Sequence, residues 1–246
     1  MASLPPASQI PVRIGEVVLG KYVVERVIGS GSMGSLVAVR HQQLGELYAM
    51  KFLLPHLMLA EGGVARYMQE ASTAARLRSE HAVKVHDVGQ LPNGAVYMLM
   101  EYVHGSDLQS WLTKRGPLPP SDAALYLMQA CDAIGEAHAL GIVHRDLKPA
   151  NLLLTSRANG TSCVKVLDFG ISKSQRPDGY ASSMTRTSAV MGSPHYMSPE
   201  QIRSAKYVGS SADIWSLGVV LHELLSGTTP FSGATLGGLC GAILTE

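Results

Sequence analysis

The feature that most constrains the fold is a glycine-rich hexapeptide, Gly29-Ser30-Gly31-Ser32-Met33-Gly34, with strand-like sequence on both sides. The run before it covers Tyr22 to Ile28, and a second β-branched run resumes at Leu36 to Val39. Dinucleotide-binding folds share the pattern GxGxxG, but there a helix follows the glycines directly. Strands on both sides exclude that fold and predict a hairpin. Its glycines serve either as a plain turn or as backbone that can approach a ligand closely.

Hydrophobic periodicity divides the chain at Gly105 into a β-rich part and a helical part. Before Gly105 the pattern predicts three further strands and one helix, which cover residues 47–53, 83–88, 96–102 and, for the helix, 64–77. Together these patterns predict an α+β chain of two lobes. Its expected parts are a disordered lead-in (1–15), a β-rich N-terminal lobe (16–100), a joint (101–104) and a helical C-terminal lobe (105–246).

Two long helices dominate the second part. Ser121 and Asp122 are predicted to cap the first helix, which ends at Gly141. Its predicted apolar stripe consists of Leu125, Met128, Cys131, Ile134 and His138. The second helix covers residues 213–225 and is apolar nearly all round, which predicts that it is buried.

Composition sets limits on partners and compartment. The 246 residues are 46% hydrophobic and 16% charged with a net charge of +1, which is typical of a globular protein and favours neither nucleic acid nor an anionic membrane. The three cysteines are widely spaced, as for buried thiols in a reducing cytoplasm. Neither a signal peptide nor a membrane-spanning stretch is recognisable. A cytoplasmic protein without nucleic-acid partners is therefore expected.

The residues that carry chemistry lie in His144-Arg145-Asp146-Leu147-Lys148-Pro149-Ala150-Asn151 and in Asp168-Phe169-Gly170. Two carboxylates and an amide at this spacing suit phosphoryl transfer from a nucleotide, in which a protein chiefly positions groups and neutralises charge. Asp146 would accept or orient the proton of the attacking hydroxyl. Asn151 and Asp168 would hold the metal ions, and Lys148 would neutralise charge on the transferring group.

The glycine-rich hexapeptide and the two motifs above are joined by Tyr48-Ala49-Met50-Lys51 and Ser198-Pro199-Glu200. The motifs and their order along the chain resemble those of eukaryotic-type (Hanks-type) serine/threonine protein kinases, closest to the bacterial PknB-like kinases. The resemblance implies one bilobal kinase domain over residues 16–246, whose N-lobe carries one regulatory helix. It implies ATP and Mg²⁺ as cofactors, with Mn²⁺ as an alternative. The implied activity is phosphorylation of serine and threonine hydroxyls on proteins, in bacterial signal transduction.

The resemblance also assigns the nucleotide-binding residues. Lys51 would contact the α- and β-phosphates and be held by Glu70, while backbone groups of Glu101 and Val103 would bind adenine. Met100 would be the gatekeeper, and an acid at position 107 would bind the ribose. The full expected set is Ile28, Gly29, Gly31, Gly34, Leu36, Ala49, Lys51, Glu70, Met100, Glu101, Val103, Asp107 and Leu153.

Regulation is implied by the residues around the activation loop. Arg145 precedes the catalytic Asp146, as in kinases that a loop phosphate switches on, and autophosphorylation is expected at Thr185 and Thr187. Ser193 would keep the hydroxyl that serves the catalytic residues. The acid Asp213 would brace the backbone of the catalytic loop.

Two other functional classes remain open. A kinase-fold scaffold would bind nucleotide or partners without catalysis, and a small-molecule phosphotransferase would share the fold but lack a long loop for peptide acceptors. Relatives continue beyond Phe231 through further helices, whereas this sequence stops at Glu246. Glu200 would then lack its arginine partner, so we expect a destabilised or aggregation-prone lobe, and a catalytically impaired fragment is the alternative reading. Related kinases often dimerise through the N-lobe, so the resemblance offers such a homodimer as a candidate assembly, although no residue of the sequence demonstrates it.

Overall fold

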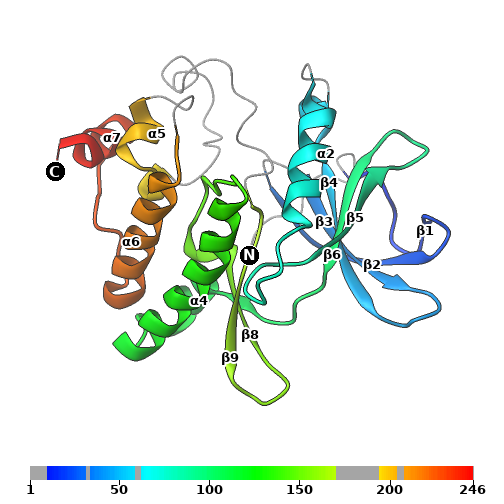
Figure 1. Cartoon of the computed structure of the whole chain (residues 1–246), viewed down its shortest axis with the longest axis horizontal. Coiled ribbons are helices and arrows are strands. Elements are labelled where there is room, and N and C mark those ends of the chain that lie inside the picture. The colour runs from blue at the N-terminus through cyan, green and yellow to red at the C-terminus, as the bar shows by residue number, and fades with distance from the viewer. Residues whose placement is uncertain (1–9, 32–33, 59–61, 170–193, 204–207, 246) are drawn as a thin grey trace. The chain divides into compact units, whose positions relative to one another are not determined.

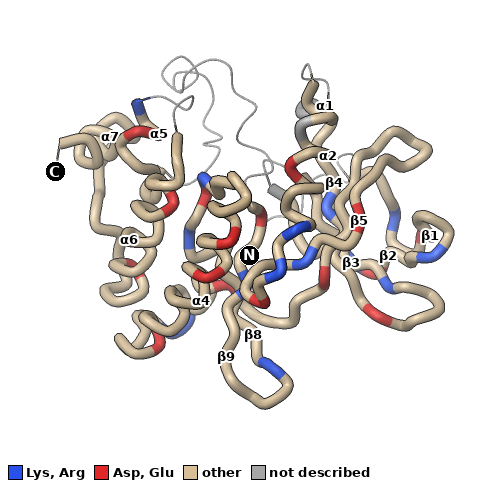
Figure 2. Tube along the Cα trace, viewed as in Figure 1, with Lys and Arg blue, Asp and Glu red and all other residues tan. Residues whose placement is uncertain are grey.

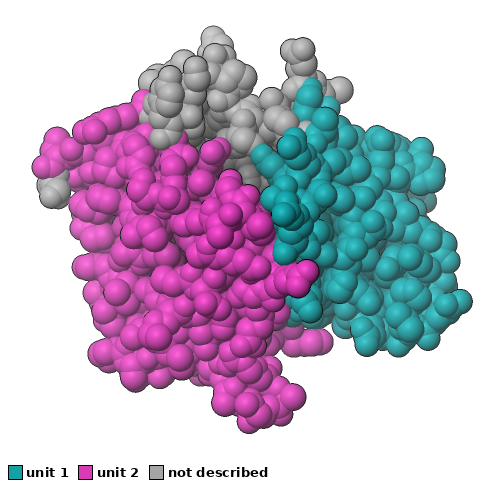
Figure 3. All heavy atoms as spheres, in the orientation of Figure 1, with its two compact units in different colours: residues 1–76, 83–103 teal, residues 77–82, 104–246 magenta. Residues whose placement is uncertain are grey.

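The computed structural model describes residues 10–31, 34–58, 62–169, 194–203 and 208–245 (Figure 1). Contacts divide the chain into two compact units, coloured separately in Figure 3. The first unit holds residues 1–76 and 83–103, and the second holds residues 77–82 and 104–246. The short segment 77–82 thus groups with the second unit, although it lies inside the stretch predicted for the first lobe.

A six-stranded antiparallel sheet forms the first unit, with the strand order β1-β2-β3-β4-β6-β5 (Figure 1). The strands are β1 (Val17–Val18), β2 (Tyr22–Gly31), β3 (Gly34–His41), β4 (Leu47–Leu53), β5 (Val85–Gln90) and β6 (Val96–Glu101). Two helices follow β4, namely α1 (Pro55–Met58) and α2 (Gly63–Ala74). The hairpin predicted around the glycine-rich hexapeptide is present, because β2 and β3 pair up to Gly31 and Gly34.

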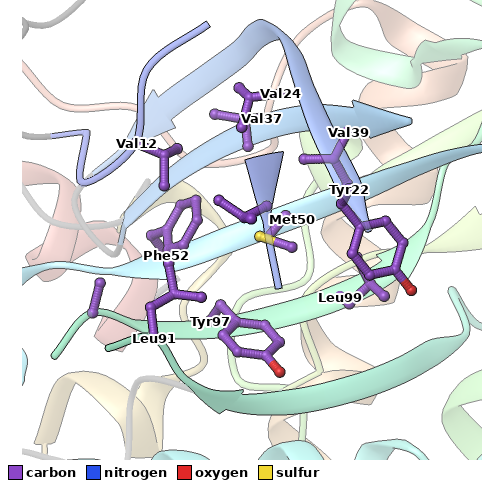
Figure 4. Close-up of a cluster of buried hydrophobic side chains, with 12 residues drawn as sticks. Val12, Tyr22, Val24, Val37, Val39, Met50, Phe52, Leu91, Tyr97 and Leu99 are labelled. Carbon is purple, nitrogen blue, oxygen red and sulfur yellow. The ribbon is translucent and has the colours of Figure 1, made fainter. Parts of the chain in front are cut away.

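One face of this sheet carries the core of the first unit. Side chains alternate along a strand, so every second residue of β3, β4 and β6 reaches the same face. Figure 4 shows the converging side chains, which include Val37, Val39, Met50, Phe52, Tyr97 and Leu99. Val12 joins this cluster. The structure therefore differs from the predicted lead-in at residues 10–15, because burial of the Val12 side chain holds this segment against the sheet.

The second unit contains a three-stranded sheet and most of the helices. Its strands, in the order β7-β8-β9, are β7 (Ser106–Asp107), β8 (Leu152–Ser156) and β9 (Ser162–Val166). Its helices are α3 (Leu108–Arg115), α4 (Pro120–Ala139), α5 (Pro199–Arg203), α6 (Ser211–Ser226) and α7 (Leu236–Thr245), with 3₁₀ turns η2 (Pro149–Asn151) and η4 (Pro194–Tyr196). The β8–β9 hairpin was not predicted, although Asn159-Gly160 between two apolar runs is a recognised hairpin signal.

Helix α4 corrects two predictions. Pro120 is its first residue, and no side chain caps its N-terminus, so the capping role of Ser121 and Asp122 is wrong. The predicted stripe is also wrong, because Met128 is 70% exposed and Leu125 is exposed as well. The buried face consists of Ala123, Tyr126, Leu127, Ala130, Ala133, Ile134 and Ala137. Alanines let neighbouring elements pack closely against this face, and a stripe drawn through the larger residues missed them.

Two further expectations are met only in part. Helix α6 was predicted to be buried nearly all round but buries one side only, because Ile214 is 60% exposed and Leu225 is exposed too. Cys163 and Cys240 are buried thiols, whereas Cys131 is exposed on α4. Across the described residues, no helix combines the length and the apolar character that crossing a membrane requires. Acidic and basic residues are scattered over the elements of both units (Figure 2).

Candidate functional site

Asp146 lies at the centre of the candidate site in the second unit. The Lys148 Nζ donates a 3.0 Å hydrogen bond to the Asp146 Oδ2, and both side chains are only partly exposed. The Asn151 Nδ2 donates to the Asp146 carbonyl at 2.8 Å and lies 3.4 Å from Oδ2. The 3₁₀ turn η2 creates this proximity, because the Asn151 N–H bonds back to the Lys148 carbonyl at 2.9 Å. All three predicted catalytic residues therefore meet on one short segment.

Asp213 fixes the backbone that leads to this segment. Its carboxylate is fully buried, and its two oxygens accept hydrogen bonds of 2.8 Å from the backbone N–H groups of His144 and Arg145. The His138 Nε2 lies 2.7 Å from the same carboxylate. Burying a carboxylate is costly unless donors satisfy it, and here three donors do so. The predicted bracing role of Asp213 agrees with this geometry.

His144 connects the two halves of the candidate site. Its Nδ1 accepts from the Asp146 N–H at 3.3 Å, so its Nε2 carries the proton and donates to the Leu167 carbonyl at 2.7 Å. Burial lowers the pKa of His144 below its usual value, and this outweighs the nearby carboxylates, which raise it. The neutral imidazole of His144 thus links the segment that contains Asp146 to Leu167, the residue before Asp168.

Asp168 lies two residues after the end of β9 and takes an uncommon backbone conformation. Its φ is +57°, and that of Arg145 is +63°, in the left-handed region that residues other than glycine rarely adopt. Such strain costs about 1–3 kcal/mol and tends to concentrate at functional sites. The neighbouring Phe169 is buried, and its ring lies 5.4 Å from that of His144.

The residue types near Asp168 are ones that can hold a magnesium ion. The Leu167 N–H donates to the Asn151 carbonyl at 2.9 Å, which brings Asn151 next to the start of the Asp168 segment. An amide oxygen and a carboxylate are the hard ligands that Mg²⁺ prefers, and Mg²⁺ usually takes its other ligands from water and phosphate.

The Ser-Pro-Glu segment is tied to the same loop by a residue that the sequence analysis missed. Gln201 donates through Nε2 to the Arg145 carbonyl at 3.0 Å, while its Oε1 accepts from the Ser198 N–H at 2.9 Å. Glu200, expected to lack a partner, accepts a 3.1 Å hydrogen bond from the Ser211 hydroxyl. Only the three-dimensional position of Gln201 reveals its role, because nothing distinguishes it within its helix.

The sequence analysis also missed a buried pair, Tyr196 and Glu223. The Tyr196 hydroxyl donates to the Glu223 carboxylate at 2.6 Å, and both residues are buried. Burial raises the pKa of Tyr196, and the hydrogen bond to Glu223 raises it further. The signal was present in the sequence, since Glu223 is an acid within the otherwise apolar stretch of α6.

Four of the residues predicted to bind the nucleotide share one face of the sheet in the first unit, namely Leu36, Ala49, Lys51 and Met100. The strand register pairs Leu36 with Lys51, and Ala49 with Met100. These positions alternate with the core residues Met50 and Phe52, so they lie on the face opposite the core. Lys51 is only 8% exposed on this face.

The glycine hairpin also has a steric requirement. A side-chain carbon at Gly34 would lie 1.9 Å from the Phe52 carbonyl oxygen, which no packing tolerates. At Gly29 the same carbon would meet nothing within 4 Å, and Ile28 beside it is exposed. Gly34 is thus required for the pairing of β3 with β4, whereas Gly29 is not needed for packing.

Other predicted site residues have local roles. Asp107 is the N-cap of α3, and its oxygens accept from the Ser110 N–H and the Ser110 hydroxyl, each at 2.7 Å. Leu153 pairs with Asp107 across β7 and β8. Glu70 lies on α2, and Glu101 ends β6 with Val103 two residues later. Four predicted positions, Gly170, Thr185, Thr187 and Ser193, lie outside the described residues.

Comparisons with known proteins agree with this geometry. A family model described as protein kinase domain matches residues 22–238. Serine/threonine-protein kinase pkn3 of Myxococcus xanthus is 37% identical over 95% of this chain and 42% of its own length. PrkC of Bacillus subtilis and PknB of Mycobacterium tuberculosis, both serine/threonine-protein kinases, are also 37% identical, over 89% and 87% of this chain.

A solved structure supports the fold independently. Rad53 1-466 in complex with AMP-PNP superposes with a TM-score of 0.73 at 26% identity, over 91% of this chain and 53% of that one. The chain spans less than half of the length of the curated relatives named above, with 32% of PrkC and 33% of PknB covered.

Proposed function

Since this chain belongs to the protein kinase domain family, we propose that it transfers the γ-phosphoryl group of ATP to serine and threonine hydroxyls of proteins. The observation that carries the proposal is the convergence of Lys148 and Asn151 on Asp146. Phosphoryl transfer needs a carboxylate that orients the attacking hydroxyl and a nearby cation that stabilises the charge on the transferring phosphoryl group. The curated relatives at 37% identity are serine/threonine kinases, which supports the same class of acceptor.

Each unit supplies one part of this chemistry. In the second unit, Asp146 orients the acceptor hydroxyl and Lys148 neutralises charge on the transferring group. Asn151 and Asp168 would hold Mg²⁺, which would supply further neutralisation of phosphate charge. In the first unit, Lys51 binds the phosphates with the support of Glu70. The glycine hairpin brings its backbone close to the same phosphates.

The finer features of the function extend this proposal. We infer that the chain phosphorylates its own Thr185 and Thr187, with Arg145 as the phosphate partner, and that it acts in cytoplasmic signalling in a bacterium. A homodimer through the first unit would allow this reaction in trans. We also propose Asp107 and Leu153 as ribose and base contacts, and exclude nucleic acid as a partner because the net charge is only +1.

The test is the intact mass of the purified chain after incubation with Mg·ATP, beside an Asp146→Asn variant. We expect added phosphate in the wild type alone, mapping to Thr185 or Thr187, and loss of the reaction with EDTA until Mg²⁺ or Mn²⁺ is restored. ADP binding without any phosphate transfer to the chain or to a general protein substrate would identify a scaffold instead. Transfer to an aminoglycoside but to no protein would identify a small-molecule phosphotransferase.

A further inference from the structure

Arg26 has no role in the chemistry above, yet it joins two segments of the first unit that lie far apart in the sequence. Its Nη2 donates a 2.6 Å hydrogen bond to the Tyr102 hydroxyl, and its Cζ lies 5.4 Å from the centroid of the Tyr102 ring. Tyr102 stands between Glu101 and Val103, the two residues proposed to bind the base through their backbone. Arg26 lies on β2, two residues before Ile28.

An irregularity in β2 directs Arg26 to this position. Val24 pairs with Val39 and Arg26 pairs with Ala38, so Glu25 is an extra residue between two successive pairs. In a regular strand Arg26 would share the face of Val24, which is buried in the core. An extra residue of this kind re-aims the side chains that follow it, and Arg26 therefore lies on the opposite face.

Arg26 begins a row of residues that crosses four strands. The register pairs Arg26 with Ala38, Ala38 with Ala49, and Ala49 with Met100. Directly paired residues share a face, so the row belongs to the face proposed to receive the nucleotide. The two alanines in the middle of the row carry only methyl groups and are buried. Arg26 and Met100 stand at its two ends.

We propose that Arg26 is a positioning residue for the nucleotide, through its contact with Tyr102. The hydrogen bond and the stacked guanidinium hold β2, and the glycine hairpin that it leads into, at a fixed distance from the segment that binds the base. A planar guanidinium can donate to a hydroxyl and lie over a ring, which an ammonium does less well. The inference rests on the proposed kinase function and adds a residue to its nucleotide site.

The expected effect is modest and falls on binding. The Arg26 side chain is 50% exposed, so we expect its loss to weaken nucleotide binding about three- to tenfold. The catalytic groups of the second unit are untouched. Loss of an interaction that acts equally on the ground state and the transition state raises KM and leaves kcat unchanged.

The experiment is a double-mutant cycle on the full chain, with Arg26→Met, Tyr102→Phe and the double variant. ADP affinity is measured by calorimetry, and KM for ATP and kcat by phosphoryl transfer. We expect Arg26→Met to raise both Kd and KM, Tyr102→Phe to raise them less because its ring remains, and the double variant to match Arg26→Met. Arg26→Lys should recover part of the affinity.

Arg40→Met is the matched control. Arg40 is 43% exposed and donates to the Glu25 carboxylate, which also lies 3.7 Å from the Arg26 Nη1, but no described contact joins Arg40 to Tyr102. The control therefore removes a neighbouring arginine of the same cluster and leaves the contact between Arg26 and Tyr102 in place. We expect wild-type ADP affinity for this control. An unchanged Kd for Arg26→Met, additive effects in the double variant, an equal loss in Arg40→Met, or a lower kcat at constant KM would each overturn the inference. A wild-type chain that binds no nucleotide would instead refute the proposed function, and the inference with it.

Discussion

Replacement of Asp213 tests most directly how the catalytic segment is held. In Asp213→Ala, three donors lose their acceptor, namely the buried N–H of His144, the partly buried N–H of Arg145 and the partly buried His138 ring. A buried donor left unpaired costs about 1–3 kcal/mol, and here the His144 N–H alone is fully buried. Total stability of a domain is about 5–15 kcal/mol, so this single change removes a large part of it.

Asp213→Asn separates shape from charge. Only the Arg145 N–H bonds to Oδ1, while the other two donors share Oδ2. An amide oriented with its oxygen at the Oδ2 position keeps those two contacts and loses one, so we expect a loss of about 1–3 kcal/mol. Phosphoryl transfer should fall in both variants, because Arg145 and Asp146 lose part of the scaffold that fixes them.

The assay is urea denaturation of both variants beside Asp132→Ala, followed by phosphoryl-transfer rates under folding conditions. Asp132 lies on the exposed side of α4, and its replacement should change stability by less than about 0.5 kcal/mol. A free energy of unfolding for Asp213→Ala within about 1 kcal/mol of wild type would refute the argument that donors left without the Asp213 carboxylate destabilise the chain. So would a greater loss in Asp213→Asn than in Asp213→Ala.

Three further predictions concern the hairpin, the buried imidazole and the catalytic cation. Gly34→Ala should lower stability and abolish ADP binding, because the new methyl carbon would overlap the Phe52 carbonyl, whereas Gly29→Ala should keep the wild-type melting temperature. Stability should fall as the pH drops below 6.5, because His144 binds a proton in the unfolded chain but stays neutral in the folded one, where burial lowers its pKa. The free energy of unfolding should therefore differ less between pH 7.5 and pH 5.5 in His144→Asn than in the wild type. Lys148→Ala should retain ADP affinity and lower the transfer rate about 10²–10³-fold, and a rate within threefold of wild type would argue against its role.

Much of the fold follows from local sequence. The strands around Gly29 and Gly34, the strand at 47–53 and the helix at 213–225 were predicted within a few residues, because periodicity and turn residues act over short distances. The kinase fold and the resemblance to bacterial serine/threonine kinases are confirmed by the comparisons. Motifs of fixed spacing sufficed for this result, because Asp146 and Asn151 approach each other through one local turn.

The sequence failed where burial is set by what packs on each side. Nothing local in α4 indicates that its alanines face inward and Met128 outward, since that choice depends on the strands and helices that it meets. The same holds for the extra residue at Glu25, which can be recognised only from the pairing of β2 with β3. Periodicity describes a helix or strand in isolation and cannot identify its neighbours.

The sequence by itself thus determined the family to which this chain belongs, because Asp146, Lys148, Asn151 and Asp168 occupy short motifs that carry the resemblance. Tertiary structure decided which contacts hold those residues in place, and of these the resemblance had led us to expect only the one from Asp213. Asp213 and Gln201 reach the catalytic segment from more than 50 positions away in the sequence. Such contacts depend on the folding of distant segments onto one another, and buried polar groups must then find partners wherever the fold brings them.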